Sequence, residues 1–207
     1  MDVFVDGNRV EQSFATGSLK DALLHVQSDL CPADHIVVGI RCDGRDLPGD
    51  AMAAALEQPA RDFSTLEVFT GTRPKLVAEA MSQASASLQE TEDACRHVVE
   101  LLASGRVQEG VVKLGECLKI WQQVHDAVAK SLQMLDLDPT AVTIQDEPML
   151  EVIAQPRGTL LQIKQALQAQ DYVLLSDVLQ YELGDVTDRW FSLIAHLRQE
   201  AEDRLAS

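Results

Sequence analysis

The spacing of apolar residues along the chain changes near Arg73. Before this point, apolar and polar residues alternate in short runs that are interrupted by Asp-Gly and Pro-Gly pairs. After it, apolar residues recur every three or four positions almost to the end of the sequence. Alternation is typical of half-buried strands, and the longer period is typical of amphipathic helices. The sequence therefore predicts an α+β protein, with a strand-rich unit over residues 1–72 and a helical unit over residues 73–207.

The first unit is predicted to combine a sheet with one helix. Its five strands are expected over residues 1–5, 10–14, 35–42, 45–47 and 65–70. The first two strands form a hairpin around Asp6-Gly7-Asn8, whose residues accept positive φ. Ser18 caps a helix that ends near Leu30, because Pro32 cannot continue it.

The order strand, strand, helix, strand, short strand, strand resembles the ubiquitin-like β-grasp. The resemblance rests mainly on Ile40-Arg41-Cys42-Asp43-Gly44-Arg45-Asp46-Leu47 followed by an acidic strand, and it covers residues 1–72. It implies a folded recognition or oligomerisation unit. Conjugated ubiquitin-like proteins end in a flexible tail with paired glycines, whereas here Thr70-Gly71-Thr72-Arg73-Pro74 leads directly into a predicted helix. Conjugation is therefore not expected.

In the second unit, four apolar stripes predict an antiparallel four-helix bundle. The third helix should be capped by Asp146 and kinked at Pro156 or broken near Gly158. The turns at residues 101–107 and 167–173 look related, and each is followed by a helix that carries a Trp. This faint internal repeat is compatible with duplicated helical hairpins.

The last helix is predicted to be apolar on two sides. One broad face must be core: Tyr172, Leu175, Leu179, Leu183, Val186, Trp190, Leu193 and Leu197. Leu174 and Tyr181 lie on nearly the opposite side. A helix of this kind is usually covered on both sides, by another part of the chain, by a second copy or by a partner. Leu174, Asp177 and Tyr181 are therefore the candidate partner-binding residues, and the alternative is that Leu174 and Tyr181 contact the N-terminal unit.

The sequence offers few residues with a possible catalytic or metal-binding role. Glu182 and Arg189 are expected to form a partly buried pair, and a catalytic role for Glu182 is the less favoured interpretation. His125 falls within an apolar stripe, so we expect a buried, hydrogen-bonded residue rather than a metal ligand. The sequence contains no His-x-x-x-His pair, phosphate-binding glycine loop or nucleophile elbow. No catalytic residue, metal site or cofactor is predicted, and we do not expect an enzyme.

The charge of the chain limits its partners. Residues 1–72 carry five basic against twelve acidic side chains, and residues 73–207 carry twelve against twenty-one, which gives a net charge of −16. Nucleic acids and anionic membranes would be repelled by both units, whereas basic partners are allowed. The four cysteines form no Cys-x-x-Cys pair, the N-terminus lacks the features of a signal peptide, and no apolar run approaches a membrane span. These observations predict reduced thiols in the cytoplasm.

The stretch over residues 166–183, which contains Asp171-Tyr172-Val173-Leu174-Leu175, adds a second resemblance. Together with the layout of the whole chain, it resembles a type of uncharacterised bacterial protein in which a ubiquitin-like start precedes a helical bundle with a similar signature. That resemblance implies a fold and no activity. The size and acidity of the bundle are also similar to those of flagellar and type III export chaperones.

These patterns favour a non-catalytic adaptor or chaperone-like protein that holds a partner helix against Leu174, Tyr181 and the neighbouring acids. One alternative is a small-ligand-binding protein or enzyme with a site between the two units, formed by Glu182, His125 or Tyr172. Another is a structural homodimer formed through the last helix.

Overall fold

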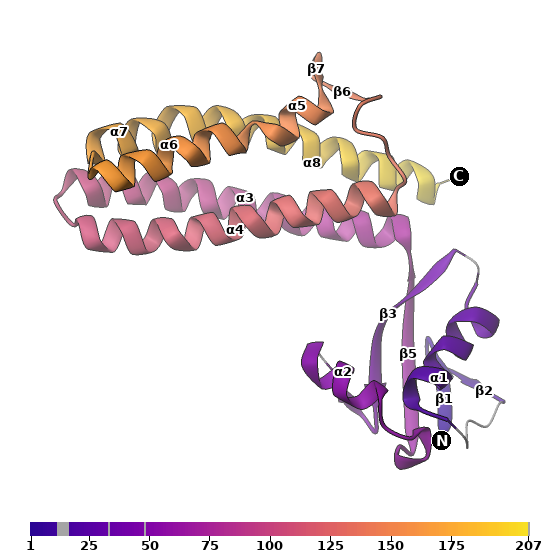
Figure 1. The fold of residues 1–207 in the computed structure, drawn as a ribbon. Helices are drawn as coiled ribbons and strands as arrows, with labels where there is room; N and C mark the ends of the chain where they lie inside the picture. The colour runs from indigo at the N-terminus through magenta and orange to yellow at the C-terminus, as the bar shows by residue number, and fades with distance from the viewer. Residues whose placement is uncertain (12–16, 33, 48, 207) are drawn as a thin grey trace. The chain divides into compact units, whose positions relative to one another are not determined.

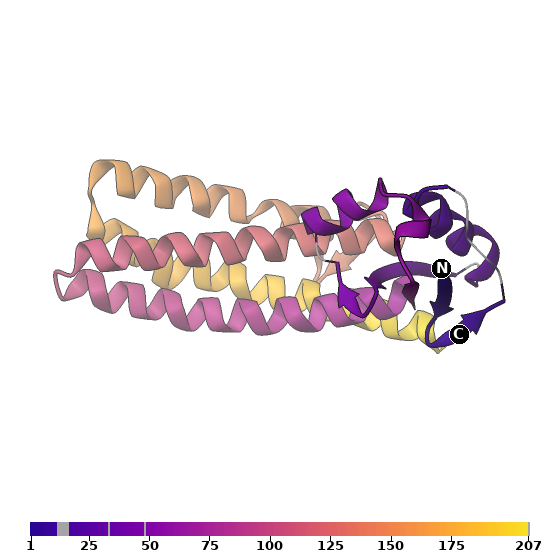
Figure 2. The ribbon, with the colours of Figure 1, turned by 90° about the horizontal axis from the view of Figure 1, so that it is seen from below.

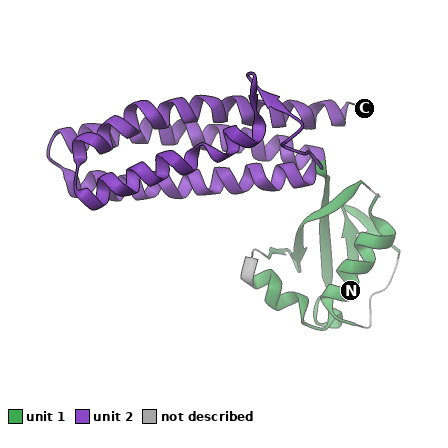
Figure 3. Cartoon of the chain, turned by 45° about the horizontal axis from the view of Figure 1, so that its top comes forward, with its two compact units in different colours: residues 1–73 green, residues 74–207 purple. Residues whose placement is uncertain are grey.

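The computed structural model describes residues 1–11, 17–32, 34–47 and 49–206. Within it, the chain divides into two compact units, residues 1–73 and 74–207 (Figure 3). This division lies one residue beyond the boundary expected from the change in apolar spacing. That each unit folds by itself stays a prediction.

The described residues of the first unit form a mixed five-stranded sheet (Figure 1). Its strands are β1 (Asp2–Val5), β2 (Asn8–Val10), β3 (His35–Cys42), β4 (Arg45–Asp46) and β5 (Thr65–Thr72). The strand order is β2-β1-β5-β3-β4, with β1 parallel to β5 and the other neighbours antiparallel. The predicted hairpin, the strand over residues 35–42 and the closing strand are confirmed. The second strand, expected over residues 10–14, lies at Asn8–Val10 instead; Glu11 is outside it, and residues 12–14 lie outside the described residues.

The predicted helix of the first unit is present as α1 (Leu19–His25), which continues as the π-helix η1 (Val26–Leu30). Ser18 caps it as expected: the Asp21 backbone N–H donates to Ser18 Oγ at 3.2 Å, and the Ser18 N–H donates to the Asp21 carboxylate at 2.9 Å. The helix packs its apolar side against the sheet, and the buried residues of this core are Val3, Leu19, Val26, Ile40, Cys42, Ala55, Leu66 and Val68.

Two short helices of the first unit were not expected, α2 (Gly49–Leu56) and the 3₁₀-helix η2 (Ala60–Asp62). The Pro48-Gly49 pair indicated a loop at this point. The residues that follow are rich in alanine, which has the highest intrinsic helix propensity. That propensity was the available signal for α2.

The second unit is mostly helical (Figure 2). Its elements are α3 (Arg73–Ala103), α4 (Val107–Met134), β6 (Thr143–Ile144), β7 (Glu147–Pro148), α5 (Met149–Ala154), α6 (Pro156–Ala169), α7 (Tyr172–Asp177), the π-helix η3 (Val178–Glu182) and α8 (Leu183–Leu205). The long helices α3 and α4 lie side by side, and α6 runs beside the segment formed by α7, η3 and α8 (Figures 1 and 2).

The two turns that looked related in sequence have the same backbone geometry. The N–H groups of Arg106 and Asp171 each donate to a carbonyl five residues earlier, both at 2.9 Å. The residue before each donor has left-handed backbone, with φ of 77° at Gly105 and 53° at Gln170. Both turns are therefore Schellman-type helix ends. This shared geometry supports the view of two related helical hairpins.

The third helix of the second unit differs in part from expectation. The helix is interrupted at Gln155, because α5 ends at Ala154 and α6 begins at Pro156, in agreement with the alternative at Pro156; Gly158 lies inside α6, so the alternative near Gly158 is wrong. The predicted cap at Asp146 is wrong. Gln145 and Asp146 have φ of 50° and 69° and form the turn between β6 and β7, and Pro148 precedes α5 instead. Two consecutive residues with left-handed backbone are typical of a tight hairpin turn. Asp146 is part of this turn and therefore does not cap a helix.

The last helix begins after Asp171, as predicted, and the Leu174 N–H donates to the Asp171 carboxylate at 3.0 Å. Near its start lies the π-helix η3, in which the Leu183 N–H donates to the Val178 carbonyl, five residues earlier. Val178 and Leu179 of this turn are both buried. Most of the predicted core face is confirmed, because Leu175, Leu179, Leu183, Val186, Trp190, Leu193 and Leu197 are buried, while Tyr172 is only partly buried.

Candidate functional site

The candidate partner-binding residues lie on the solvent side of α7 and η3. Leu174 is 44% exposed and Tyr181 is 63% exposed, and Asp177 is also exposed. Leu174 and Asp177 are three residues apart on α7 and therefore share a side of the helix, and Tyr181 follows in η3. By contrast, Leu175 is 0% exposed. The structure thus separates this side from the core of the second unit, and its use by a partner stays a prediction.

The same side is strongly acidic. Residues 172–188 contain four carboxylates and no Lys, Arg or His. The four are exposed, and among the residues that the structure describes none of them has an ion-pair partner: Asp177, Glu182, Asp185 and Asp188. We define the acidic apolar face as Val173, Leu174, Asp177, Tyr181, Asp185 and Asp188, whose members all are exposed. It offers apolar side chains flanked by uncompensated negative charge.

The expected pair between Glu182 and Arg189 is not formed. Glu182 is exposed, and Arg189 Nη2 instead lies 3.8 Å from Glu147 Oε1 at the start of β7. Two helical turns, about 10 Å of axial rise, separate positions 182 and 189. Arg189 pairs instead with Glu147, which comes from a different element. Because Arg189 and Glu147 are both about 40% exposed, their pair contributes little to stability.

The expectation that His125 is buried is wrong. Its side chain is 46% exposed, its ring stacks on that of Trp190 at a centroid distance of 5.8 Å, and its Nδ1 lies 3.8 Å from Asp126. The buried line of α4 passes through Val124 and Val128 instead, which turns His125 toward the edge of the core. In the described part of the chain, no group of three or more His, Cys, Asp or Glu residues is arranged to hold a metal ion.

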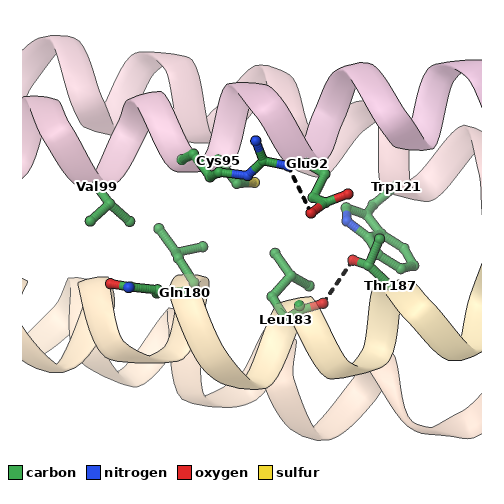
Figure 4. Close-up of a pocket in the computed structure, with 10 residues that line it drawn as sticks. Glu92, Cys95, Val99, Trp121, Gln180, Leu183 and Thr187 are labelled. Carbon is green, nitrogen blue, oxygen red and sulfur yellow. Dashed lines mark hydrogen bonds and ion pairs between the residues drawn. The ribbon is translucent and has the colours of Figure 1, made fainter.

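A partly open cavity of about 240 Å³ lies in the second unit between α3, α4 and the segment formed by η3 and α8 (Figure 4). Its apolar lining residues are Cys95, Val99, Trp121, Leu179 and Leu183, and its polar ones are Glu92, Arg96, Gln180 and Thr187. Gly184 completes the lining. No sequence pattern predicts this cavity, because its walls come from helices that are far apart in the chain.

The polar groups around the cavity have different partners. Arg96 donates to the Glu92 carboxylate at 2.9 Å and also lies 3.0 Å from Asp93 Oδ1, so these three side chains together carry one net negative charge. Thr187 Oγ1 donates to the Leu183 carbonyl at 2.7 Å and keeps its capacity to accept. Among the described residues, the Gln180 side chain has no hydrogen-bond partner.

The cysteine at the cavity wall is not an activated nucleophile. A hydrogen bond between the Cys95 and Cys117 thiols, together with burial, raises the pKa of Cys95. A thiol with a raised pKa is protonated and weakly nucleophilic near neutral pH. All four cysteines of the chain are free.

Comparison with known proteins identifies a family for the second unit. Residues 79–192, more than half of the chain, match the model of a domain of unknown function, DUF8042. This range begins in α3, ends in α8, and contains both the acidic apolar face and the lining of the cavity. No curated protein and no solved structure matches the chain. Among the described residues, no helix has both the length and the apolar character that crossing a membrane requires. The chain belongs to the DUF8042 family.

Proposed function

We propose that this chain is a non-catalytic adaptor or chaperone-like protein of the bacterial cytoplasm, and that it binds a basic amphipathic helix on the acidic apolar face. The observation that carries the proposal is the exposure of Leu174 and Tyr181 in a stretch with four unpaired carboxylates and no basic residue. The free state of all four cysteines is consistent with a reducing compartment.

The proposal extends to the fold of each unit. The strand order β2-β1-β5-β3-β4, with β1 parallel to β5, supports a ubiquitin-like β-grasp for the first unit. The two Schellman-type turns, and the succession of α3, α4, α6 and the segment from α7 to α8, support an antiparallel four-helix bundle for the second. These are the two parts of the bacterial protein type that the sequence resembles.

The chemistry of the face specifies the partner. Leu174 and Tyr181 are seven residues apart, which matches the two-turn repeat of apolar residues on an amphipathic helix. Exposed aromatic residues such as Tyr181 are frequent anchors in protein interfaces. Asp177, Asp185 and Asp188 would lie opposite the Lys or Arg residues that flank such a helix. The net charge of −16 would speed the encounter with a basic partner.

A fluorescein-labelled amphipathic peptide built from Leu and Lys tests this assignment by fluorescence anisotropy with the full chain. We expect it to bind the wild type, and Tyr181→Ser to weaken binding about tenfold, which is about 1.4 kcal/mol, because an exposed aromatic anchor is lost. Val112→Ser is the matched control, since Val112 is an exposed apolar residue of α4 outside the face. It should change the affinity less than about twofold, within the usual range for a surface substitution.

A companion peptide of Leu and Glu should bind much more weakly. Added salt should weaken the binding of the Leu and Lys peptide, because salt screens the attraction between opposite charges. Equal affinity of wild type and Tyr181→Ser for the basic peptide would contradict the proposal. Self-association of the wild type that Tyr181→Ser abolishes would instead assign the face to a second copy of the chain, the homodimer considered above.

A further inference from the structure

The cavity of the second unit has the size and lining of a binding site for a small molecule. At about 240 Å³ it exceeds the ~150 Å³ of an apolar protein cavity that binds benzene. Val99 and Cys95 project from α3 toward Leu183 and Gln180, and Trp121 closes one end (Figure 4). None of the residues of the acidic apolar face lines this space.

Gly184 lines the cavity, and close packing does not explain why this residue is a glycine. A Cβ atom built at this position would meet no atom within 4 Å. At Gly110, in contrast, a Cβ would lie 3.1 Å from Leu102 Cδ2, so close packing explains that glycine. A glycine inside a helix costs about 1 kcal/mol relative to alanine. Since Gly184 lines the cavity, glycine at this position leaves that part of the wall without a side chain.

The wall beside Gly184 is irregular. Leu179 and Gln180 reach the cavity from η3, and π turns within helices are frequent at functional sites. Among the described residues, the Gln180 amide has no hydrogen-bond partner, and Thr187 Oγ1 can still accept a hydrogen bond. A hydroxyl group on a ligand could therefore donate to one of these two side chains.

We infer that this cavity binds a small, uncharged aromatic alcohol, with its ring among Trp121, Leu179 and Leu183 and its hydroxyl near Gln180 and Thr187. An aromatic ring fits the Trp-lined apolar space, and one polar group uses the two available side chains. The local excess of one negative charge and the net charge of −16 disfavour an anion. Glu92 and Asp93 are both already paired with Arg96, which leaves little to attract a cation. The inference concerns a second site and does not rest on the proposed peptide binding.

The test uses 4-fluorobenzyl alcohol as the probe and ¹⁹F NMR line broadening with the full-length chain as the readout. We expect binding to the wild type and at least a tenfold weaker affinity for Gly184→Leu, whose side chain fills the cavity. Gly115→Leu is the matched control, because Gly115 is an exposed helical glycine with open space that does not line the cavity. It should bind the probe as the wild type does.

A second variant tests the polar half of the site and does not depend on filling the cavity. Thr187→Val should weaken the binding of 4-fluorobenzyl alcohol more than the binding of 4-fluorotoluene, because only the alcohol can donate a hydrogen bond to Thr187 Oγ1. Thermal melts of all variants check that they are folded. Absence of broadening with the wild type, or equal affinity of wild type and folded Gly184→Leu, would overturn the inference. Neither result would affect the peptide titration with Tyr181→Ser.

Discussion

Replacing Leu175 with Asp is expected to unfold the helical unit, whereas replacing the adjacent Leu174 with Asp leaves it folded. Leu175 is 0% exposed, and an unpaired carboxylate there costs several kcal/mol, a large share of the stability of a typical domain. Leu174 is 44% exposed, so its Asp remains hydrated, and we expect the free energy of unfolding to fall by less than about 1 kcal/mol. Thermal melts followed by circular dichroism measure both.

The pair Leu179→Asp and Tyr181→Asp repeats this comparison farther along the helix. Leu179 is buried and Tyr181 is exposed, so the first should collapse the unit and the second should leave its helix content unchanged. If Leu174→Asp and Tyr181→Asp unfolded the protein as fully as the two core variants, both residues would be ordinary core. The acidic apolar face would then have no support.

Trp190→Ala is expected to lower the free energy of unfolding by about 3–5 kcal/mol, the usual cost of truncating a large buried aromatic residue. Trp190 is fully buried, and its Nε1 donates to the Val152 carbonyl at 3.1 Å. Its ring also meets Trp121 edge-to-face at 5.3 Å and lies under His125. One side chain therefore joins α4, α5 and α8.

Chemical denaturation with circular dichroism detection measures this loss for the full chain. Trp190→Phe is the graded control, because it keeps an aromatic ring and removes the Nε1 donor, and it should cost less than Trp190→Ala. A loss below about 1 kcal/mol for Trp190→Ala would show that Trp190 does not organise the core of this unit.

The sequence predicted those features that depend on local periodicity. The core side of the last helix, from Leu175 to Leu197, follows from an apolar period that persists over six turns. The same period predicts that Leu174 and Tyr181 point away from the core. The strand over residues 35–42 was predicted with its exact bounds, because a long apolar run is bounded by Pro32 on one side and Asp43-Gly44 on the other.

Other features depend on tertiary contacts that no local pattern contains. The Glu182 to Arg189 pair was wrongly expected, because the residue that pairs with Arg189 is Glu147 of β7, and spacing along the last helix does not reveal that neighbour. His125 lies about 100° from Val124 on α4, and only the neighbouring helices decide whether such an edge position is covered. The cavity requires knowing that Cys95, Trp121 and Gly184 become neighbours, which residue spacing does not reveal.

The most direct test of the central claim is to map the Leu and Lys peptide onto the ¹⁵N-labelled full chain by amide chemical shifts. If the acidic apolar face is the binding surface, the largest changes fall within residues 173–188, and Tyr181→Ser strongly reduces them. Changes centred on Val112 of α4 or Leu161 of α6, or spread evenly over the acidic surface of both units, would contradict the claim.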